Sequence, residues 1–446
     1  MVVFLLVLIV VLALLGAVHW YVWRRLVRDV TRRGSLPRRL GTVAVVVLPV
    51  LSFAALGSAR AGAPFRLQQL VAWPGYLWLA LLLYVTLALV VGEAVRPVLR
   101  AWLARRDAAD AAAATPSVPA PAPAREPVPA AAQPAEPTGS TGPTGPSDPT
   151  GPVEADVPSG PAAGPGSVPT EVSRRLFVSR VVGGAAAAAA VGTVGYGTYG
   201  VLRGPRIKRV TVPLAKVPRA AHGYRIAVVS DIHLGPILGR AHTQRIVDAI
   251  NSTQPDLIAV VGDLVDGTVE NLGPAAEPLA RLRARHGSFF VTGNHEYFSG
   301  ADAWVDHVRE LGLRPLRNER VEIAAGFDLA GVDDIAGESE GQGPDFARAL
   351  GDRDRARAAV LLAHQPVVVH DAVRHGVDLQ LSGHTHGGQL WPGNYLAELA
   401  NPTVAGLERY GDTQLYVSRG AGAWGPPVRV GAPSDITLVQ LASKQA

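Results

Sequence analysis

Cysteine is absent from this chain of 446 residues. Its absence excludes disulfide bonds, thiolate metal ligands and cysteine nucleophiles. Charged residues are also scarce at 18%, whereas hydrophobic residues reach 48%. The apolar excess is concentrated in the first third of the chain, which predicts membrane-spanning segments rather than one oversized core.

The net charge is +5. We assign this balance to cytoplasmic arginines that flank membrane helices. No basic block is interleaved with aromatic residues, so we expect no nucleic-acid partner.

Three apolar runs, at about 2–22, 41–59 and 75–94, predict a membrane region over 1–106 with three transmembrane helices. The first run could instead be a cleavable signal peptide, but no charged region precedes it and arginines follow it. Seven arginines lie between the first two runs, which places that loop in the cytoplasm and the N-terminus outside.

Residues 107–172 are rich in Ala, Pro, Gly, Ser and Thr, which predicts a disordered linker. Residues 173–203 begin with Ser-Arg-Arg-Leu-Phe and continue as a soft apolar stretch. This is either a twin-arginine-like export segment or a helix with ordinary flanking charges. We expect an uncleaved fourth span, which places the C-terminal domain outside the cytoplasm. If the segment were peripheral, the domain would be cytoplasmic.

Basic residues follow this fourth segment: Arg203, Arg206, Lys208 and Arg209. They could hold the C-terminal domain close to anionic lipid headgroups, or they could simply be solvated. Their charge does not favour either orientation of the segment.

Short polar blocks in the C-terminal half each follow an apolar run that predicts a strand. The blocks are Asp231-Ile232-His233, Gly262-Asp263-Leu264-Val265-Asp266, Gly293-Asn294-His295-Glu296, His364 and Gly383-His384-Thr385-His386. Strands that end in polar turns can bring many ligands to one point, and oxygen and imidazole groups suit metal ions. The segment 240–251 has helical periodicity and lies between two of these strands, so we predict an α/β domain over 207–446.

The order and types of these residues resemble the calcineurin-like metallophosphoesterase family, and more closely its membrane-associated bacterial branch. The resemblance covers roughly residues 207–442 and implies two stacked sheets flanked by helices. It implies that Asp231, His233 and His386 bind one metal ion. It assigns Asn294, His364 and His384 to a second ion and Asp263 to both.

His295 is not needed as a ligand and lies next to Asn294, so it is our candidate for the acid that protonates the leaving oxygen. The resemblance implies that Asp266 orients this imidazole. Glu296 is expected to support the ligands, with simple exposure to solvent as the alternative. Separation by one residue, as in Asp231/His233 and His384/His386, would let each pair reach around a centre from an extended turn. Glycines 262, 293 and 383 would allow close backbone approach.

We therefore expect a membrane-anchored dimetal phosphoesterase that hydrolyses a phosphate mono- or diester or a pyrophosphate with metal-activated water. Mixed histidine and carboxylate ligands favour Mn, Fe or Zn. The membrane anchor favours a lipid-linked or envelope phosphate ester as substrate and membrane lipids as partners. Trp391 and Trp424 are expected to pack in the interior, with an apolar wall for a lipid-like substrate as the alternative.

Two other functional classes are weaker. A non-catalytic metal-binding membrane module would be expected to lack several of these ligands, whereas all are present. A transporter would be expected to carry ionisable residues in mid-span, and only Glu93 lies near the end of a predicted span. The sequence does not indicate an oligomeric state.

Overall fold

The computed structural model describes residues 2–114 and 170–445. The chain forms two compact units, Met1–Ala94 together with Ser179–Ala446, and Val95–Val178. Most of the predicted linker, 115–169, lies outside the described residues.

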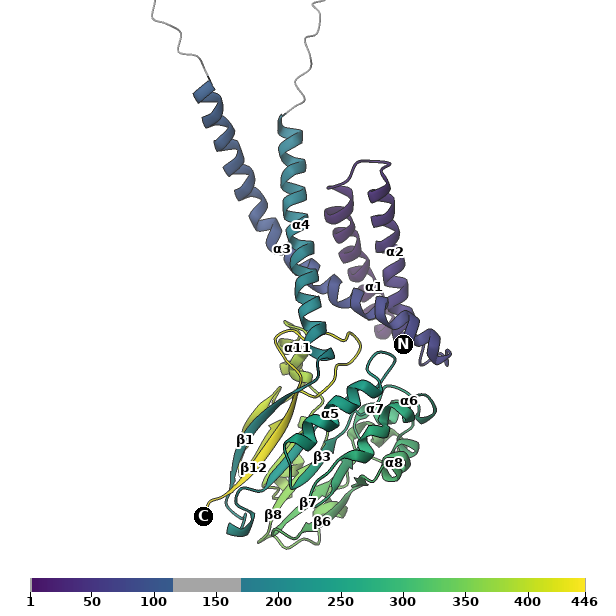
Figure 1. Cartoon of the computed structure of the whole chain (residues 1–446), viewed down its shortest axis with the longest axis vertical. Coiled ribbons are helices and arrows are strands. Elements are labelled where there is room, and N and C mark those ends of the chain that lie inside the picture. Colours follow the sequence, from purple (N-terminus) through teal and green to yellow (C-terminus); the bar gives the residue numbers. More distant parts are fainter. Residues whose placement is uncertain (1, 115–169, 446) are drawn as a thin grey trace, which may run out of the picture. The chain divides into compact units, whose positions relative to one another are not determined.

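The apolar runs of the sequence form long helices (Figure 1). These are α1 (Val2–Trp23), α2 (Leu36–Gly57), α3 (Phe65–Ala114) and α4 (Thr170–Leu202). By length and composition, four helices among the described residues could cross a membrane. The twin-arginine interpretation of the start of α4 stays a prediction.

Three helices are longer than their apolar runs suggest. α4 begins at Thr170, so residues 170–172 of the expected linker are helical. α2 begins at Leu36 rather than near 41, because Pro37 in its first turn has a φ suited to starting a helix. α3 continues to Ala114, so residues 107–114 of the expected linker are helical. This stretch is rich in alanine, the residue with the highest helix propensity.

The C-terminal domain contains two six-stranded sheets. The first has the order β1-β12-β2-β3-β4-β5 and the second β10-β11-β9-β8-β7-β6. The strands of the first sheet are β1 (Arg206–Leu214), β2 (Arg225–Val229), β3 (Leu257–Val261), β4 (Ser288–Val291), β5 (Arg314–Pro315) and β12 (Asp435–Ser443). Those of the second sheet are β6 (Glu319–Ile323), β7 (Phe327–Gly331), β8 (Ala358–Leu362), β9 (Leu379–Ser382), β10 (Gly406–Tyr410) and β11 (Thr413–Val417).

Parallel pairing brings the ends of the central strands to one edge of each sheet. In the first sheet β2, β3, β4 and β5 pair in parallel, and in the second β7, β8, β9 and β11 do so. At one edge of the first sheet, β1 pairs in parallel with β12, so the first and last strands of the domain run side by side (Figure 1). The predicted two-sheet α/β fold is confirmed.

The core has three layers because the central strands are apolar on both faces. In β2, Ile226 and Val228 belong to the cluster between the sheets, whereas Ala227 and Val229 pack with the helices outside the first sheet. Those helices are α5 (Arg240–Ser252), α6 (Val269–Ala276) and α8 (Ala301–Glu310). α9 (Phe346–Leu350) and α10 (Val369–Arg374) pack on the outer face of the second sheet.

Within the first unit, the long helices also contact the α/β domain. Val428 shares an apolar cluster with Ala80 of α3 and Val194 of α4. The Tyr84 hydroxyl of α3 donates a hydrogen bond of 3.0 Å to the carbonyl oxygen of Trp391. The segment after His386 and the segment near Val428 are therefore held against helices that could cross a membrane.

Candidate metal centre

The polar blocks follow the C-terminal ends of strands from both sheets. Asp231 and His233 follow β2, and Asp263 follows β3. Asn294 follows β4 and begins the short helix α7 (Asn294–Ser299). The second sheet supplies three histidines after β8 and β9, which are His364, His384 and His386. Seven residues from five strand ends thus converge at one place.

One group joins Asp231, His233 and His386, whose ligand atoms all lie within 4.8 Å of one another. Nε2 of His233 is 3.0 Å from Nε2 of His386. Nε2 of His386 lies 3.4 Å from Oδ1 of Asp231. Without a cation, the contact between the two imidazoles is a hydrogen bond when one nitrogen carries its hydrogen. All three ligand atoms also lie close enough together to bind one shared cation.

The second group joins Asp263, His364 and His384 within the same distance. Nε2 of His364 is 3.1 Å from Oδ2 of Asp263. That same carboxylate oxygen lies 3.7 Å from Nε2 of His233, so Asp263 stands between the two groups. Asn294 joins the second group through Oδ1, 3.0 Å from Nδ1 of His384.

A buried nitrogen in the second group indicates that these residues fit a metal. Nδ1 of His364 is 2.9 Å from the carbonyl oxygen of Val261, to which it can donate its hydrogen. Its Nε2 is buried and has no hydrogen-bond partner among the described residues. A histidine that donates one ring N–H to a carbonyl oxygen and leaves its other nitrogen without a hydrogen-bond partner has the usual arrangement of a metal ligand. The donor set of carboxylates, imidazoles and one amide suits two divalent ions.

The buried carboxylates depend on the imidazoles around them. Burial raises the pKa of Asp231 above its ordinary value. Burial also disfavours ionised Asp263, but the adjacent His364 and His233 bring the pKa of that carboxyl below its usual range. Asp263 is therefore the more readily ionised of the two, as an anion between the two ligand groups requires.

Next to the first group, His295 contacts Asp266. Nδ1 of His295 lies 2.7 Å from Oδ1 of Asp266. The same oxygen lies 2.9 Å from Nδ1 of His233. Burial opposes ionisation of Asp266, but His233 and His295 lower its pKa to about 2. Asp266 therefore fixes a proposed ligand and the proposed acid at once.

The backbone of the ligand turns differs from the extended turns expected from the sequence. Five of the seven expected ligands have a positive φ, in the left-handed region that non-glycine residues seldom adopt. They are Asp231 (52°), His233 (48°), Asp263 (52°), His384 (72°) and His386 (53°). Tight left-handed turns, rather than alternation along an extended strand, thus direct these side chains inward. Such backbone outliers gather at functional sites.

Two glycines allow the close packing of this site. A Cβ atom on Gly293 would lie 2.3 Å from Oδ1 of Asp263, and one on Gly383 would lie 2.4 Å from Oδ2 of Asp231. Neither position tolerates a side chain without displacing a carboxylate. These glycines therefore act through close approach, as the sequence suggested.

Glu296 supports the ligand turns from beneath. Its buried carboxylate accepts hydrogen bonds from the backbone N–H groups of Asp263 (2.9 Å), Leu264 (2.8 Å) and Gly293 (2.6 Å). Two ligand-bearing turns are thereby tied to one carboxylate, which agrees with the supporting role expected for Glu296.

Arg429 is a functional residue that sequence reasoning missed. Its Nη2 lies 3.0 Å from Nδ1 of His386, and its Nη1 donates to the carbonyl oxygens of His386 (2.9 Å) and Arg419 (2.6 Å). Burial and this guanidinium keep the pKa of His386 well below its ordinary value, so the imidazole is neutral, as ligation requires. A single arginine in a loop without a motif offers no sequence signal of such a contact.

Two cavities open onto the ligand groups. The smaller, of about 480 Å³, is lined by His233, Asp266 and His295. The larger, of about 1000 Å³, is lined by Asp263, Asn294 and His384. His295, Phe298, Trp424 and Arg60 line both. Arg60 belongs to the segment between α2 and α3, so the first hundred residues contribute directly to the site.

The expected interior packing is wrong for both tryptophans, of which Trp424 lies at the site. This side chain is half exposed, lines both cavities and places its ring 5.8 Å from that of His295. Trp391 is also half exposed but lines neither cavity. The alternative, an apolar wall at the site, therefore applies to Trp424.

Comparison with known proteins gives a consistent result. A family model described as calcineurin-like phosphoesterase matches residues 224–388. A "transmembrane protein with metallophosphoesterase domain" from Danio rerio is 39% identical over 264 residues, which cover 56% of this chain and 60% of that protein. An uncharacterized metallophosphoesterase from Helicobacter pylori is 38% identical, with 56% of this chain and 67% of the relative covered.

A third relative, an uncharacterized metallophosphoesterase from Aquifex aeolicus, is 35% identical over 54% of this chain and 92% of its own length. The matched part of the chain thus spans nearly the whole Aquifex aeolicus relative, but only about three fifths of the length of the Danio rerio one.

Proposed function

Because the chain belongs to the calcineurin-like metallophosphoesterase family, we propose that it is a membrane-anchored enzyme that hydrolyses a phosphate ester with two divalent metal ions. The observation that carries this proposal is the pair of ligand groups that share Asp263 as a neighbour. Asp231, His233 and His386 would hold one ion, and Asn294, His364 and His384 the other, with Asp263 between them.

Two ions at such a site supply an activated water and neutralise the charge of the phosphoryl oxygens. The residues around them position the substrate and move the proton. His295 lines both cavities. With Nδ1 held by Asp266, its Nε2 is free to carry a proton to the leaving oxygen. Asp266 keeps the ring of His295 in one orientation.

An amphipathic phosphate ester is the substrate class that the cavity lining supports. The larger cavity combines the ligand groups with apolar side chains, which include Leu390, Leu396 and Trp424. Leu396 belongs to α11 (Gly393–Ala400), a helix without buried residues. Leu396 and Leu399 are 71% and 84% exposed, which favours contact with an apolar phase such as the membrane interface. A lipid-linked phosphate could thus present its headgroup to the metals while its chains remain on the apolar side.

We place the α/β domain on the outer side of the membrane. Arg60, between α2 and α3, lines the same cavities as His295. This loop and the domain would therefore share one side. The opposite loop, between α1 and α2, carries five arginines, whereas the loop between α2 and α3 carries one, and arginine-rich loops stay in the cytoplasm. Protease treatment of intact cells should then cleave the C-terminal domain; cleavage only after permeabilisation would contradict this orientation.

The central test uses the full chain purified in a mild detergent. We expect about two transition-metal ions per chain and hydrolysis of a generic aryl phosphate mono- or diester. Asp263→Asn should lose both metal and activity, because this carboxylate stands between the ligand groups. Wild-type protein that is fully active after removal of all metal would exclude the proposal.

A further inference from the structure

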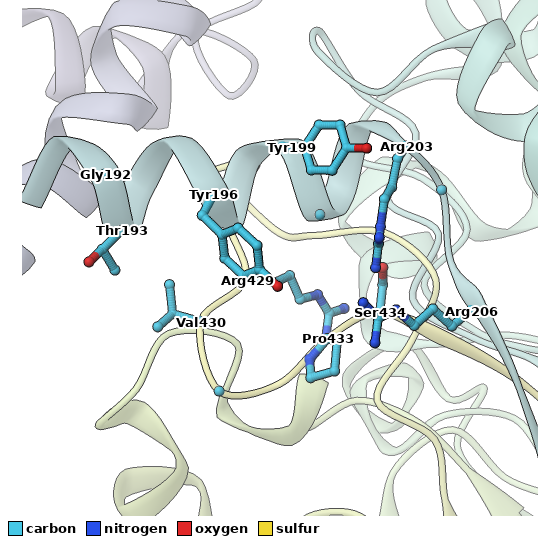
Figure 2. Close-up of a pocket in the computed structure, with 13 residues that line it drawn as sticks. Gly192, Thr193, Tyr196, Tyr199, Arg203, Arg206, Arg429, Val430, Pro433 and Ser434 are labelled. Atoms are coloured by element: carbon cyan, nitrogen blue, oxygen red, sulfur yellow. The ribbon is translucent and has the colours of Figure 1, made fainter.

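A third cavity lies where α4 meets the loop after Val428, and none of the residues that line it lines the two catalytic cavities. We call it the α4 pocket and define it by Tyr196, Tyr199, Arg203, Arg206, Arg429 and Val430. Figure 2 shows Tyr196 of α4, and Arg203 directly after this helix, extending toward the loop. Its volume, about 470 Å³, is within the range of ligand sites.

Close packing fixes the wall of the α4 pocket. A Cβ atom on Gly197 would lie 2.7 Å from Cγ1 of Val428 and 2.8 Å from the carbonyl oxygen of Arg429. The backbone of α4 therefore touches the loop directly. The cavity beside this contact is a formed feature of the fold rather than a gap between mobile segments.

The lining of the α4 pocket is positively charged. It contains three arginines and no acidic residue. Arg203 and Arg206 are exposed, and neither side chain forms a hydrogen bond or an ion pair with any described residue. The guanidinium of Arg203 lies 5.8 Å from the ring centroid of Tyr199. Arg429 is buried and bonds to carbonyl oxygens and to His386, none of which balances its charge. Such a lining attracts an anion.

The α4 pocket lies at the end of a candidate membrane span, so its ligand would also need an apolar part. The candidate span of α4 ends at Leu202, and Arg203 follows it at once. Tyr196 and Tyr199 are 74% and 62% exposed in the last turns of the helix. Tyrosines in this position favour the membrane–water interface, where headgroup phosphates lie. A ligand here would contact apolar surface along α4 and cations just beyond its end.

We propose that the α4 pocket binds the headgroup of an anionic phospholipid, with its phosphate between Arg203 and Arg206 and its chains along α4. This inference rests on the proposed membrane position of α4, but not on the proposed hydrolysis. It assigns Arg203 and Arg206 a defined ligand rather than a general attraction to the membrane. The site is separate from the catalytic cavities, so lipid bound there is a ligand and not a substrate.

Native mass spectrometry of the full chain in a non-ionic detergent tests the proposal. The probes are dioctanoyl phosphatidylglycerol, dioctanoyl phosphatidylcholine and inorganic phosphate. We expect the phosphatidylglycerol to bind wild-type protein more tightly than the phosphatidylcholine. Arg203→Gln combined with Arg206→Gln should weaken phosphatidylglycerol binding roughly thirtyfold, because each interfacial arginine contributes about a factor of five.

A matched variant separates this site from general charge attraction. Arg209→Gln combined with Arg281→Gln removes the same charge from two exposed residues outside the α4 pocket and should change the affinity less than about twofold. Thr193→Trp keeps every charge but narrows the pocket, and should also weaken binding. Equal losses in both double variants, or no loss in the first, would overturn the proposal. Displacement of the lipid by inorganic phosphate at a similar concentration would also overturn it, because the site would then be one for free phosphate.

Discussion

Nδ1 of His295 lies 2.7 Å from Oδ1 of Asp266, and this one oxygen also contacts a histidine of the first ligand group. A single carboxylate thus serves both the proposed acid and the proposed metal site. Substitutions at Asp266 and at His295 should therefore affect metal binding and proton transfer differently.

Asp266→Asn should damage both functions. The amide oxygen of asparagine can still accept a hydrogen bond, but the negative charge that holds both His233 and His295 is lost. Metal affinity should therefore fall by about 10–100-fold and kcat by about 10²-fold or more. Metal titration and steady-state kinetics on the same preparations measure these effects. Saturating metal should restore occupancy but not kcat. Full recovery of kcat with added metal would limit Asp266 to holding His233.

His295→Ala should damage only one of these functions. The His295 side chain is a member neither of the ligand group that contains His386 nor of the one that contains Asp263. The metal content of this variant should therefore match that of the wild type. The rate should fall by about 10²–10⁴-fold for substrates with a poor leaving group. A substrate whose leaving group needs no proton, such as an activated aryl ester, should be affected much less. An equal loss for both substrates would argue against an acid role.

Glu296→Gln should loosen the ligand turns. An amide offers one acceptor oxygen where the carboxylate receives three N–H groups on two oxygens. At least one buried backbone donor would then face the amide nitrogen, at a cost of about 1–3 kcal/mol. Thermal unfolding of the full chain should show a lower Tm. Glu310→Gln, an exposed substitution on α8, is the matched control and should leave the Tm unchanged.

Gly383→Ala should disrupt metal binding because the new methyl group would overlap Oδ2 of Asp231. We expect at least a tenfold loss of metal affinity, measured by competition with a chromogenic chelator. Gly239→Ala is the matched control, since its backbone has a negative φ and nothing lies within 4 Å of the added atom. Unchanged affinity in Gly383→Ala would mean that the carboxylate can move without loss of the site.

Leu396→Gln combined with Leu399→Gln tests the amphipathic substrate. These side chains are exposed, so the fold should tolerate the change. We expect kcat/KM for a long-chain phosphate ester to fall about tenfold or more, because two apolar contacts are lost. The value for a short soluble ester should stay within about twofold. If the substitutions left kcat/KM for the long-chain ester unchanged, a soluble substrate would be favoured instead.

The sequence predicted the parts of the fold that depend on apolar patterning. The buried strands β2, β3, β4 and β8 follow apolar runs. The buried strands β7 and β9 are also largely apolar, although Asp328 and Gln380 interrupt them. β1, β5, β6 and β10 were not predicted. β10 is mostly exposed, β5 has two residues, and β1 alternates charged and apolar residues with little burial. Their pairing partners, rather than their own composition, make them strands.

The site was predictable in its residue types but not in its support. A polar block after an apolar run is visible in the sequence, and all seven expected ligands converge. The left-handed turns at Asp231 and His386 are not visible, because these residue types rarely adopt them without tertiary packing. Arg429 and Arg60 reach the site from loops without motifs, and only the folded chain brings them there.

Because Arg60 lines the cavities, removal of the N-terminal residues would change the site. About 170 residues separate it from the first expected ligand in the sequence, so the C-terminal half expressed alone would keep its seven ligands and lose one wall of its cavity. Such a fragment should still degrade small artificial esters while losing its preference among natural ones. Selectivity measured on a truncated protein would thus describe the fragment, and only the intact polypeptide would report which ester is chosen.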